Sequence, residues 1–226
     1  MKIIQDILPK GLVVSCQAAE GEPLNSPSIL AAMAKSAMNG GAIGIRASGP
    51  ENISAIKKDV PLPIIGIYKQ YIPDCAVYIT PSFEAASYIS KAGSDIIALD
   101  ATENSRPGGV TAPELIARIR KELDKPVMAD ISTYEEGMKA AEWGVDIVAT
   151  TLAGYTEYTK HITETDFNLL EKLTNSLDIP VIAEGRYSTP EFAAEAIKLG
   201  AYAVVVGSAI TRPHWITAQF VKAIPK

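Results

Sequence analysis

The sequence predicts a single-domain (β/α)8 TIM barrel, and three observations lead to this fold class. First, four stretches share one pattern, in which a helix end and a glycine precede an apolar strand, and the intervals between their glycines are 53, 51 and 56 residues (Gly40, Gly93, Gly144 and Gly200). Second, three strands that open on a proline alternate with these stretches. Third, every strand reads as a continuous apolar run, which is typical of parallel strands buried on both faces. This repeat predicts eight parallel strands ringed by helices.

Strands and helices alternate along the whole chain. The first strand is the apolar run GLVVSCQ, residues 11–17. The glycine pattern covers four stretches, at 39–46, 91–100, 142–151 and 198–208. The proline pattern covers three, at 62–69, 125–132 and 179–186. Glycine suits a helix end and proline is tolerated at the first residue of a strand. Between the strands, segments such as SPSILAAMAKSAMNG and TPEFAAEAIKLG have the spacing of helices.

An open, doubly wound sheet is the main competing architecture. The chain has 226 residues, 47% of them hydrophobic, which suits one large domain or two small ones. No GxGxxG motif follows the first strand, as a dinucleotide-binding sheet would have, and the strand-pair repeat closes after four units. We therefore expect residues 1–226 to form one catalytic barrel domain.

Composition excludes several classes of function. The net charge of −5 gives no basic surplus for binding nucleic acid. The N-terminus has too short an apolar stretch for a signal peptide, and no run is long enough to cross a bilayer, so we expect a cytoplasmic protein with no membrane partner.

Cys16 and Cys75 have neither metal-binding nor redox spacing and are expected to be free thiols. His161 and His214 lack further ligands at suitable spacing, so no metal site is expected.

Polar residues end nearly every predicted strand. In a barrel of this kind, the carboxyl ends of the strands form the active site. These ends carry Gln17, Arg46, Lys69, Asp100, Asp130, Thr150 with Thr151, Glu184 with Arg186, and Gly207 with Ser208. Any one of them could be structural, for example through an ion pair between Arg46 and Asp100. Burying so many polar groups together is costly unless a ligand or a reaction uses them, so the whole ring predicts an active site.

The last two loops predict a phosphate site. EGRYSTPE follows the seventh strand, and GSAITRP follows the eighth and leads into a possible short helix. Gly185 and Gly207 would let backbone N–H groups approach an anion, Ser208 adds a hydroxyl, and Arg186 or Arg212 supplies charge. The alternative is that both glycines are ordinary turn residues. We expect a phosphorylated small molecule as the ligand, because barrels of this class hold phosphate at this position.

Lys69 and Glu184 are the candidate catalytic pair. The third and seventh strands are four apart in a ring of eight, so their ends face each other across the opening. Two proton-carrying groups on opposite sides of one acidic carbon could invert its configuration. Gln17, Arg46 and Asp130 could orient hydroxyl groups or stabilise an enolate. Two alternatives remain: a Schiff-base aldolase or another phosphosugar isomerase that uses Lys69, or a phosphosugar-binding protein without activity.

The strand-end motifs resemble those of the N-acetylmannosamine-6-phosphate 2-epimerase family, also called N-acylglucosamine-6-phosphate 2-epimerases. The motifs span nearly the whole chain: VVSCQA, GAIGIRA, LPIIGIYK, IALDAT, MADIST, TTLAGYT, PVIAEGR and VVVGSAITRP. The resemblance implies a cofactor-free isomerase of sialic acid catabolism, which converts N-acetyl-D-mannosamine 6-phosphate to N-acetyl-D-glucosamine 6-phosphate by inverting C2. It implies catalytic roles for Lys69 and Glu184.

The resemblance extends to the other site residues and to assembly. It implies sugar contacts from Gln17, Arg46 and Asp130, and phosphate contacts from Gly185, Arg186, Gly207, Ser208 and Arg212. It also favours a homodimer, as is common among barrels. Two departures from the family pattern are RASG at 46–49 and TLAGYT at 151–156, where the family usually has RANG and TLSGYT. They affect fine substrate contacts rather than the reaction.

Overall fold

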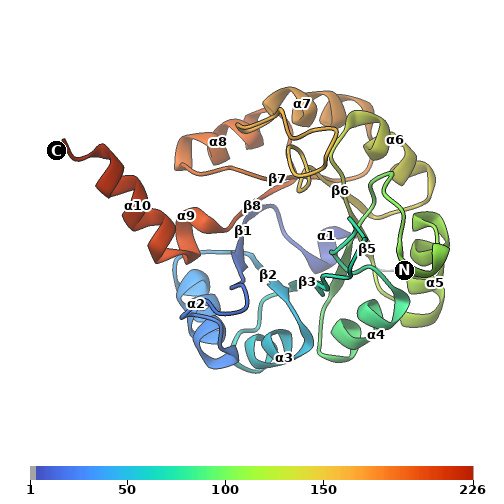
Figure 1. The fold of residues 1–226 in the computed structure, drawn as a ribbon, viewed down its shortest axis with the longest axis horizontal. Coiled ribbons are helices and arrows are strands. Elements are labelled where there is room, and N and C mark those ends of the chain that lie inside the picture. The colour runs from blue at the N-terminus through green and yellow to red at the C-terminus, as the bar shows by residue number, and fades with distance from the viewer. Residues whose placement is uncertain (1–3, 226) are drawn as a thin grey trace.

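The computed structural model describes residues 4–225, and in it eight strands form one closed, parallel barrel in sequence order (Figure 1). The strands are β1 (Gly11–Cys16), β2 (Gly44–Ser48), β3 (Ile64–Ile67), β4 (Ile96–Asp100), β5 (Val127–Asp130), β6 (Ile147–Ala149), β7 (Val181–Glu184) and β8 (Ala203–Val206). The ring closes because β1 pairs with both neighbours, so that Val13 lies opposite Gly44 on β2 and Val205 on β8. This closure confirms the barrel and excludes an open sheet.

Helices α2 to α8 surround the barrel, whereas the last helix points away from it (Figure 1). The helices are α1 (Ile4–Ile7), α2 (Pro27–Asn39), α3 (Pro50–Asp59), α4 (Phe83–Lys91), α5 (Ala112–Leu123), α6 (Tyr134–Glu142), α7 (Phe167–Ser176), α8 (Pro190–Lys198), α9 (Ser208–Thr211) and α10 (Pro213–Ala223), with a 3-10 turn at Pro107–Gly109. Several begin at residues that cap N-termini. Thr111 and Thr133, for example, each form a capping box with the glutamate three residues later, Glu114 and Glu136.

The core has two parts because side chains alternate along each strand. One cluster fills the inside of the barrel and includes Val13, Ile65 and Met128. The other lies between the strands and the outer helices and includes Val14 and Ile64. Every strand therefore buries both faces, which explains the continuous apolar runs in the sequence.

Helix α1 closes the amino-terminal end of the barrel. Ile4 and Leu8 belong to the inner cluster, and Leu8 is completely buried. The Tyr202 hydroxyl donates a hydrogen bond of 2.6 Å to the carbonyl oxygen of Leu8. Gly44 faces this plug, since a Cβ added there would lie 2.8 Å from Cδ1 of Leu8. With this end closed, the barrel opens at the carboxyl ends of its strands.

Two candidate residues do not lie at a strand end: β2 runs two residues past Arg46, and β3 stops two residues before Lys69. Arg46 is the third of the five residues of β2, so it lies inside the barrel wall rather than at its rim. Lys69 lies two residues beyond β3, where it forms an isolated antiparallel bridge with Ile79. The bridge joins the two limbs of the loop at 68–82.

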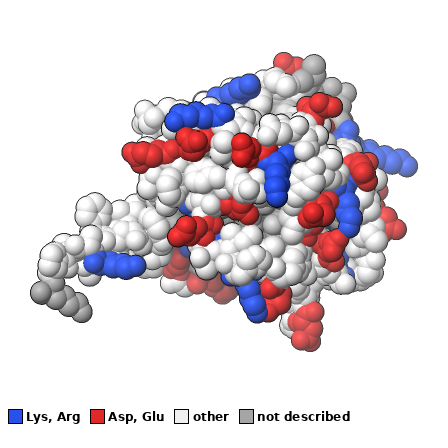
Figure 2. Space-filling view, turned by 90° about the horizontal axis from the view of Figure 1, so that it is seen from above, with Lys and Arg blue, Asp and Glu red and all other residues white. Residues whose placement is uncertain are grey.

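The surface carries no large region of a single charge on the face shown in Figure 2, where acidic and basic side chains are interspersed. None of the helices within 4–225 is sufficiently long and apolar to cross a membrane.

Candidate active site

A cavity of about 840 Å³ opens at the carboxyl ends of the strands. The predicted catalytic pair, the phosphate residues, Gln17 and Arg46 all line it, whereas Asp130 and the strand-end residues Asp100 and Thr150 do not. Its remaining walls include residues of two long loops, residues 68–82 after β3 and residues 150–166 after β6. The structure therefore gathers side chains from widely separated parts of the sequence around one volume.

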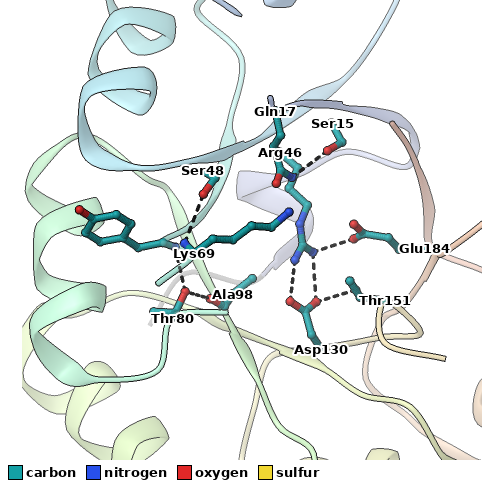
Figure 3. Close-up of polar contacts among 11 residues, drawn as sticks. Ser15, Gln17, Arg46, Ser48, Lys69, Thr80, Ala98, Asp130, Thr151 and Glu184 are labelled. Atoms are coloured by element: carbon teal, nitrogen blue, oxygen red, sulfur yellow. Dashed lines mark hydrogen bonds and ion pairs between the residues drawn. The ribbon is translucent and has the colours of Figure 1, made fainter. Parts of the chain in front are cut away.

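Arg46 forms the centre of a buried network at the floor of this cavity (Figure 3). Its NH1 group donates to Oδ1 of Asp130 at 3.1 Å and to Oε2 of Glu184 at 2.6 Å, and NH2 donates to Oδ2 of Asp130 at 2.6 Å. Burial alone would lower the pKa of Arg46, but the two carboxylates outweigh it and raise the pKa, so the guanidinium stays charged. Its Nε has no hydrogen-bond partner among the described residues.

Asp130 supports Arg46 from below and does not face the cavity. The residue is completely buried, and its carboxylate accepts from Arg46 and, at 2.6 Å, from the hydroxyl of Thr151. The sequence predicts a sugar contact for Asp130, whereas its carboxylate in the structure contacts Arg46 and Thr151. The ion pair considered for Arg46 and Asp100 does not form: Asp100 instead accepts hydrogen bonds from the backbone N–H and hydroxyl of Thr102.

Lys69 reaches into the cavity with its amine free of any ion pair among residues 4–225. Its backbone is fixed by the bridge to Ile79 and by an N–H that donates to the hydroxyl of Ser48 at 3.3 Å. Burial, and then the positive charges of Arg46 and Arg212, lower the pKa of Lys69 from 10.5 to about 8, although Glu184 opposes the shift. The amine therefore loses its proton closer to neutral pH than an exposed lysine does.

Glu184 enters the cavity from the opposite side. Figure 3 shows the side chains of Lys69 and Glu184 approaching Arg46 from its two sides, as expected for residues that follow β3 and end β7. Burial raises the pKa of Glu184, with Asp130 adding to the shift and Arg46 opposing it. The pKa values of Lys69 and Glu184 are therefore shifted towards each other. A single proton can then lie on the amine or on the carboxyl with a smaller difference in free energy.

Gln17 contributes an unoccupied acceptor beside this pair. Its Nε2 donates to the hydroxyl of Ser15 at 2.8 Å, and that bond orients the amide. Its Oε1 is buried without a protein partner in the described part of the chain. A buried acceptor of this kind is costly unless a ligand donates to it.

The predicted phosphate residues meet at the β7 and β8 side of the cavity. Gly207 caps α9, whose first N–H groups have no acceptor within the helix, and Ser208 is its first residue. Gly185 adopts a φ of 109°, a conformation that favours glycine. Arg212 lines the cavity at the end of α9. Arg186 also lines it, but its guanidinium donates to the carbonyl oxygens of Ala153 and Gly154.

Sequence reasoning missed Tyr78 and much of the loop after β6. Tyr78 lies on the returning limb of the loop after β3, where its carbonyl accepts from the N–H of Gln70 at 2.9 Å. Burial raises the pKa of its phenol to about 12, so it remains a proton donor. No strand end marks this residue in the sequence. Trp215, near the start of α10, also lines the cavity.

The two histidines lie outside this network, and both are exposed. Among residues 4–225, no group of three or more His, Cys, Asp and Glu side chains is arranged to hold a metal ion. Cys16 and Cys75 are free thiols, and burial raises the pKa of Cys16 to about 12.

Comparisons with known proteins agree on one family. Residues 30–226 match the family described as "Putative N-acetylmannosamine-6-phosphate epimerase". A relative from Caldanaerobacter subterraneus subsp. tengcongensis is 54% identical over 99% of this chain and 94% of its own length. One from Clostridioides difficile is 54% identical over 94% of this chain and 95% of its own. Both are named "Putative N-acetylmannosamine-6-phosphate 2-epimerase". The solved N-acetylmannosamine-6-phosphate 2-epimerase from Clostridium perfringens has a TM-score of 0.94 at 45% identity, covering 99% of this chain and 97% of that one.

Proposed function

The chain belongs to the N-acetylmannosamine-6-phosphate epimerase family, and from this premise we propose that it inverts C2 of N-acetyl-D-mannosamine 6-phosphate to give N-acetyl-D-glucosamine 6-phosphate. In this reaction it would act as an N-acylglucosamine-6-phosphate 2-epimerase. The observation that carries the assignment is the position of Lys69 and Glu184 on opposite sides of one cavity, with Arg46 between them (Figure 3). A one-base mechanism would not need this arrangement.

The proposed chemistry is a proton transfer at C2. In the open-chain sugar C2 lies next to the C1 aldehyde, which makes its hydrogen acidic. One group of the pair removes the C2 proton from one face, and the electron pair of the C–H bond moves onto the C1 oxygen as an enolate. The other group then donates a proton to C2 from the opposite face, and the aldehyde re-forms with inverted configuration. The positive charge of Arg46 at the floor stabilises the enolate.

The shifted pKa values suit a reversible reaction. An epimerase needs one protonated and one deprotonated group in either direction, because the proton accepted on one side is replaced from the other. The pKa of Lys69 is lowered to about 8 and that of Glu184 is raised. The two arrangements of the shared proton, on the amine or on the carboxyl, are thus brought closer in energy. Neither direction then requires an unfavourable ionisation step.

We expect kcat/KM to show a bell-shaped dependence on pH. At low pH both groups are protonated, so no base is available, and at high pH both are deprotonated, so no acid is available. The alkaline limb should lie near pH 8, where the pair loses its last proton at the lowered pKa of Lys69. Initial rates at saturating and subsaturating substrate between pH 5 and pH 10, a range chosen around the ordinary glutamate and lysine pKa values, measure this. An alkaline limb close to 10.5, the ordinary lysine value, would contradict the assignment.

We place the phosphate of the substrate at the β7 and β8 side of the cavity. It would accept from the backbone N–H groups of Gly185, Arg186, Gly207 and Ser208 and from the Ser208 hydroxyl, with Arg212 supplying charge. From there the sugar chain extends towards Lys69. The free Oε1 of Gln17 would accept from a hydroxyl or from the amide N–H of the substrate. Asp130 would act on the substrate only through Arg46.

One assay tests the reaction and separates it from the alternatives. The purified protein is incubated with N-acetylmannosamine 6-phosphate in deuterium oxide, and C2 is followed by NMR. Deuterium incorporation together with formation of the C2 epimer is the expected result. Cleavage of a carbon–carbon bond, or trapping of a lysine adduct by borohydride, would instead show a Schiff-base aldolase. Binding without any change in the spectrum would show a protein that only binds phosphosugars.

We further propose a homodimer assembled through α10. This helix buries none of its residues and stands away from the barrel (Figure 1). Phe220, Val221 and Ile224 are 69%, 66% and 65% exposed. Exposed apolar residues gathered on one helix are typical of an interface.

Light scattering coupled to size-exclusion chromatography tests the dimer. The wild-type protein is expected to elute at twice its chain mass of 24.1 kDa. Phe220→Glu should elute as a monomer, because the introduced charge would be buried in the interface, while Lys222→Ala on the same helix should remain dimeric. A monomeric wild-type protein would rule the assembly out.

The proposed location and pathway follow from the substrate. A phosphorylated sugar is an anion that does not diffuse through a bilayer, so the protein should act in the compartment where the sugar is phosphorylated. We propose that this is the cytoplasm and that the reaction serves amino-sugar and sialic acid catabolism.

A further inference from the structure

Arg186 adopts a backbone conformation that side chains rarely tolerate. Its φ is 60°, in the left-handed region, and it directly follows Gly185 with a φ of 109°. Glycine would occupy such a position without strain. A long side chain at this point therefore indicates that its contacts outweigh the unfavourable backbone.

The side chain of Arg186 contacts the loop after β6, residues 150–166. NH1 donates to the carbonyl oxygen of Ala153 at 2.7 Å, and NH2 donates to that of Gly154 at 3.1 Å. The guanidinium also lies over the ring of Tyr155, with Cζ 4.2 Å from the ring centroid. Two directional hydrogen bonds and one stacked aromatic ring hold the planar group in a single orientation.

Gly154 shows how closely the loop and the guanidinium fit together. A Cβ added at this glycine would lie 2.6 Å from NH1 and 2.9 Å from NH2 of Arg186, and 2.2 Å from the carbonyl oxygen of Ile162. Gly154 also has a φ of 77°, which disfavours any other residue. The loop can approach the guanidinium only because this position has no side chain.

Both ends of the loop are tied to the segment that carries Glu184 and Arg186. At the far end, the hydroxyl of Thr165 donates to the carbonyl oxygen of Arg186 at 2.8 Å. At the near end, the hydroxyl of Thr150 donates to the carbonyl oxygen of Glu184 at 2.8 Å and accepts from its N–H at 3.1 Å. The next residue, Thr151, is bonded to Asp130. Movement of the loop would thus displace the supports of Glu184 and Arg46.

We propose that Arg186 is a positioning residue, which clamps the loop at 150–166 against β7 and thereby holds Glu184 in place, and that its guanidinium does not bind the substrate phosphate. The supporting geometry is the pair of hydrogen bonds to the loop carbonyls, the stacked Tyr155 and the close fit at Gly154. The cationic group for the phosphate is then Arg212. The inference builds on the proposed epimerase, but the clamp itself can be observed without turnover.

The experiment compares Arg186→Ala, Gly154→Ala and Arg212→Ala with the wild-type protein. Three quantities are measured: kcat for N-acetylmannosamine 6-phosphate, the dissociation constant of inorganic phosphate by calorimetry, and hydrogen exchange of the amides in the loop at 150–166. Gly154→Ala is the informative variant, since it keeps the positive charge of Arg186 but removes the space for its contacts. Tyr155→Leu replaces it if Gly154→Ala does not fold, because Tyr155 is 55% exposed.

A clamp predicts that Arg186→Ala and Gly154→Ala behave alike. Both should lower kcat by about 10²-fold, the effect of a small misplacement of a catalytic group, and both should accelerate exchange in the loop. Phosphate affinity should change less than about threefold in both, while Arg212→Ala should weaken it at least about tenfold. Arg118→Ala on α5, whose guanidinium lies over Phe83, should leave all three quantities unchanged. The proposal would be overturned if Arg186→Ala lost as much phosphate affinity as Arg212→Ala, or if hydrogen exchange in the loop did not change. Neither result depends on which sugar the enzyme turns over.

Discussion

Lys69→Ala is expected to lower kcat by about 10³- to 10⁴-fold, because general acid–base catalysis contributes up to this amount and no other lysine among residues 4–225 lines the cavity. Lys69 lines the cavity opposite Glu184, and Arg46, the nearest other cation, is held by two carboxylates. Arg46 also remains protonated, because its pKa is raised. The variant should lose exchange of the C2 hydrogen in deuterium oxide together with epimer formation. Both are followed in the same NMR experiment.

Substrate binding and stability provide the controls for this variant. Inorganic phosphate should bind Lys69→Ala within about threefold of the wild-type affinity, since the phosphate groups lie at the β7 and β8 side of the cavity. Removing a partly buried, unpaired amine should not lower the midpoint of thermal unfolding. Lys139→Ala on α6, which breaks an exposed ion pair with Glu103 in the loop after β4, should have normal kcat. Turnover of Lys69→Ala at a rate near that of the wild type would remove this residue from the mechanism.

Arg46→Gln is expected to cause the largest loss of stability of any single substitution in the site. The change leaves Asp130 and Glu184 buried without the charge that pairs with them, and breaking such a buried pair typically costs about 3–5 kcal/mol. The free energy of unfolding from urea denaturation measures this. Activity should also fall, because Arg46 helps to lower the pKa of Lys69 and its loss raises that pKa. The alkaline limb of the pH profile should therefore move to higher pH.

The exposed ion pair between Lys57 and Asp95, of similar length, serves as the matched control for Arg46→Gln. Nζ of Lys57 lies 2.7 Å from Oδ2 of Asp95, but the two side chains are 38% and 29% exposed, whereas Arg46 and Asp130 are completely buried. Lys57→Ala should therefore cost less than about 1 kcal/mol and leave kcat unchanged. If Lys57→Ala and Arg46→Gln lowered the free energy of unfolding equally, burial of Arg46 would not determine its contribution to stability.

The candidate catalytic pair could be predicted because strand ends are marked locally. PIIGIYK and PVIAEGR each run from a proline through apolar residues to a charged one, and in a parallel barrel all such ends lie at the same side. The count of strands then places Lys69 and Glu184 opposite each other. The phosphate residues were predictable for the same reason, since GSAITRP follows the last strand directly.

Other features of the site depend on contacts that no local pattern records. Asp130 ends a strand as Glu184 does, yet it lies below Arg46 and faces no cavity. Tyr78 reaches the cavity because its loop turns back along Lys69. Arg186 lines the cavity, and its NH groups donate to carbonyl oxygens more than thirty residues earlier in the chain, which the sequence does not predict. Each outcome depends on loop paths set by packing.

The barrel, its strand order and the polar residues at its open end can be predicted from local patterns, because apolar runs and the glycines and prolines between them act within a few residues of the chain. Which of these polar groups pair with each other, and which remain free for a substrate, depends on the folded arrangement. Arg46 binds Asp130 and Glu184 rather than Asp100, while the amine of Lys69 stays unpaired within the described residues. The physical reason is that such pairings join strands far apart in sequence, and their distances follow from the closure and register of the ring.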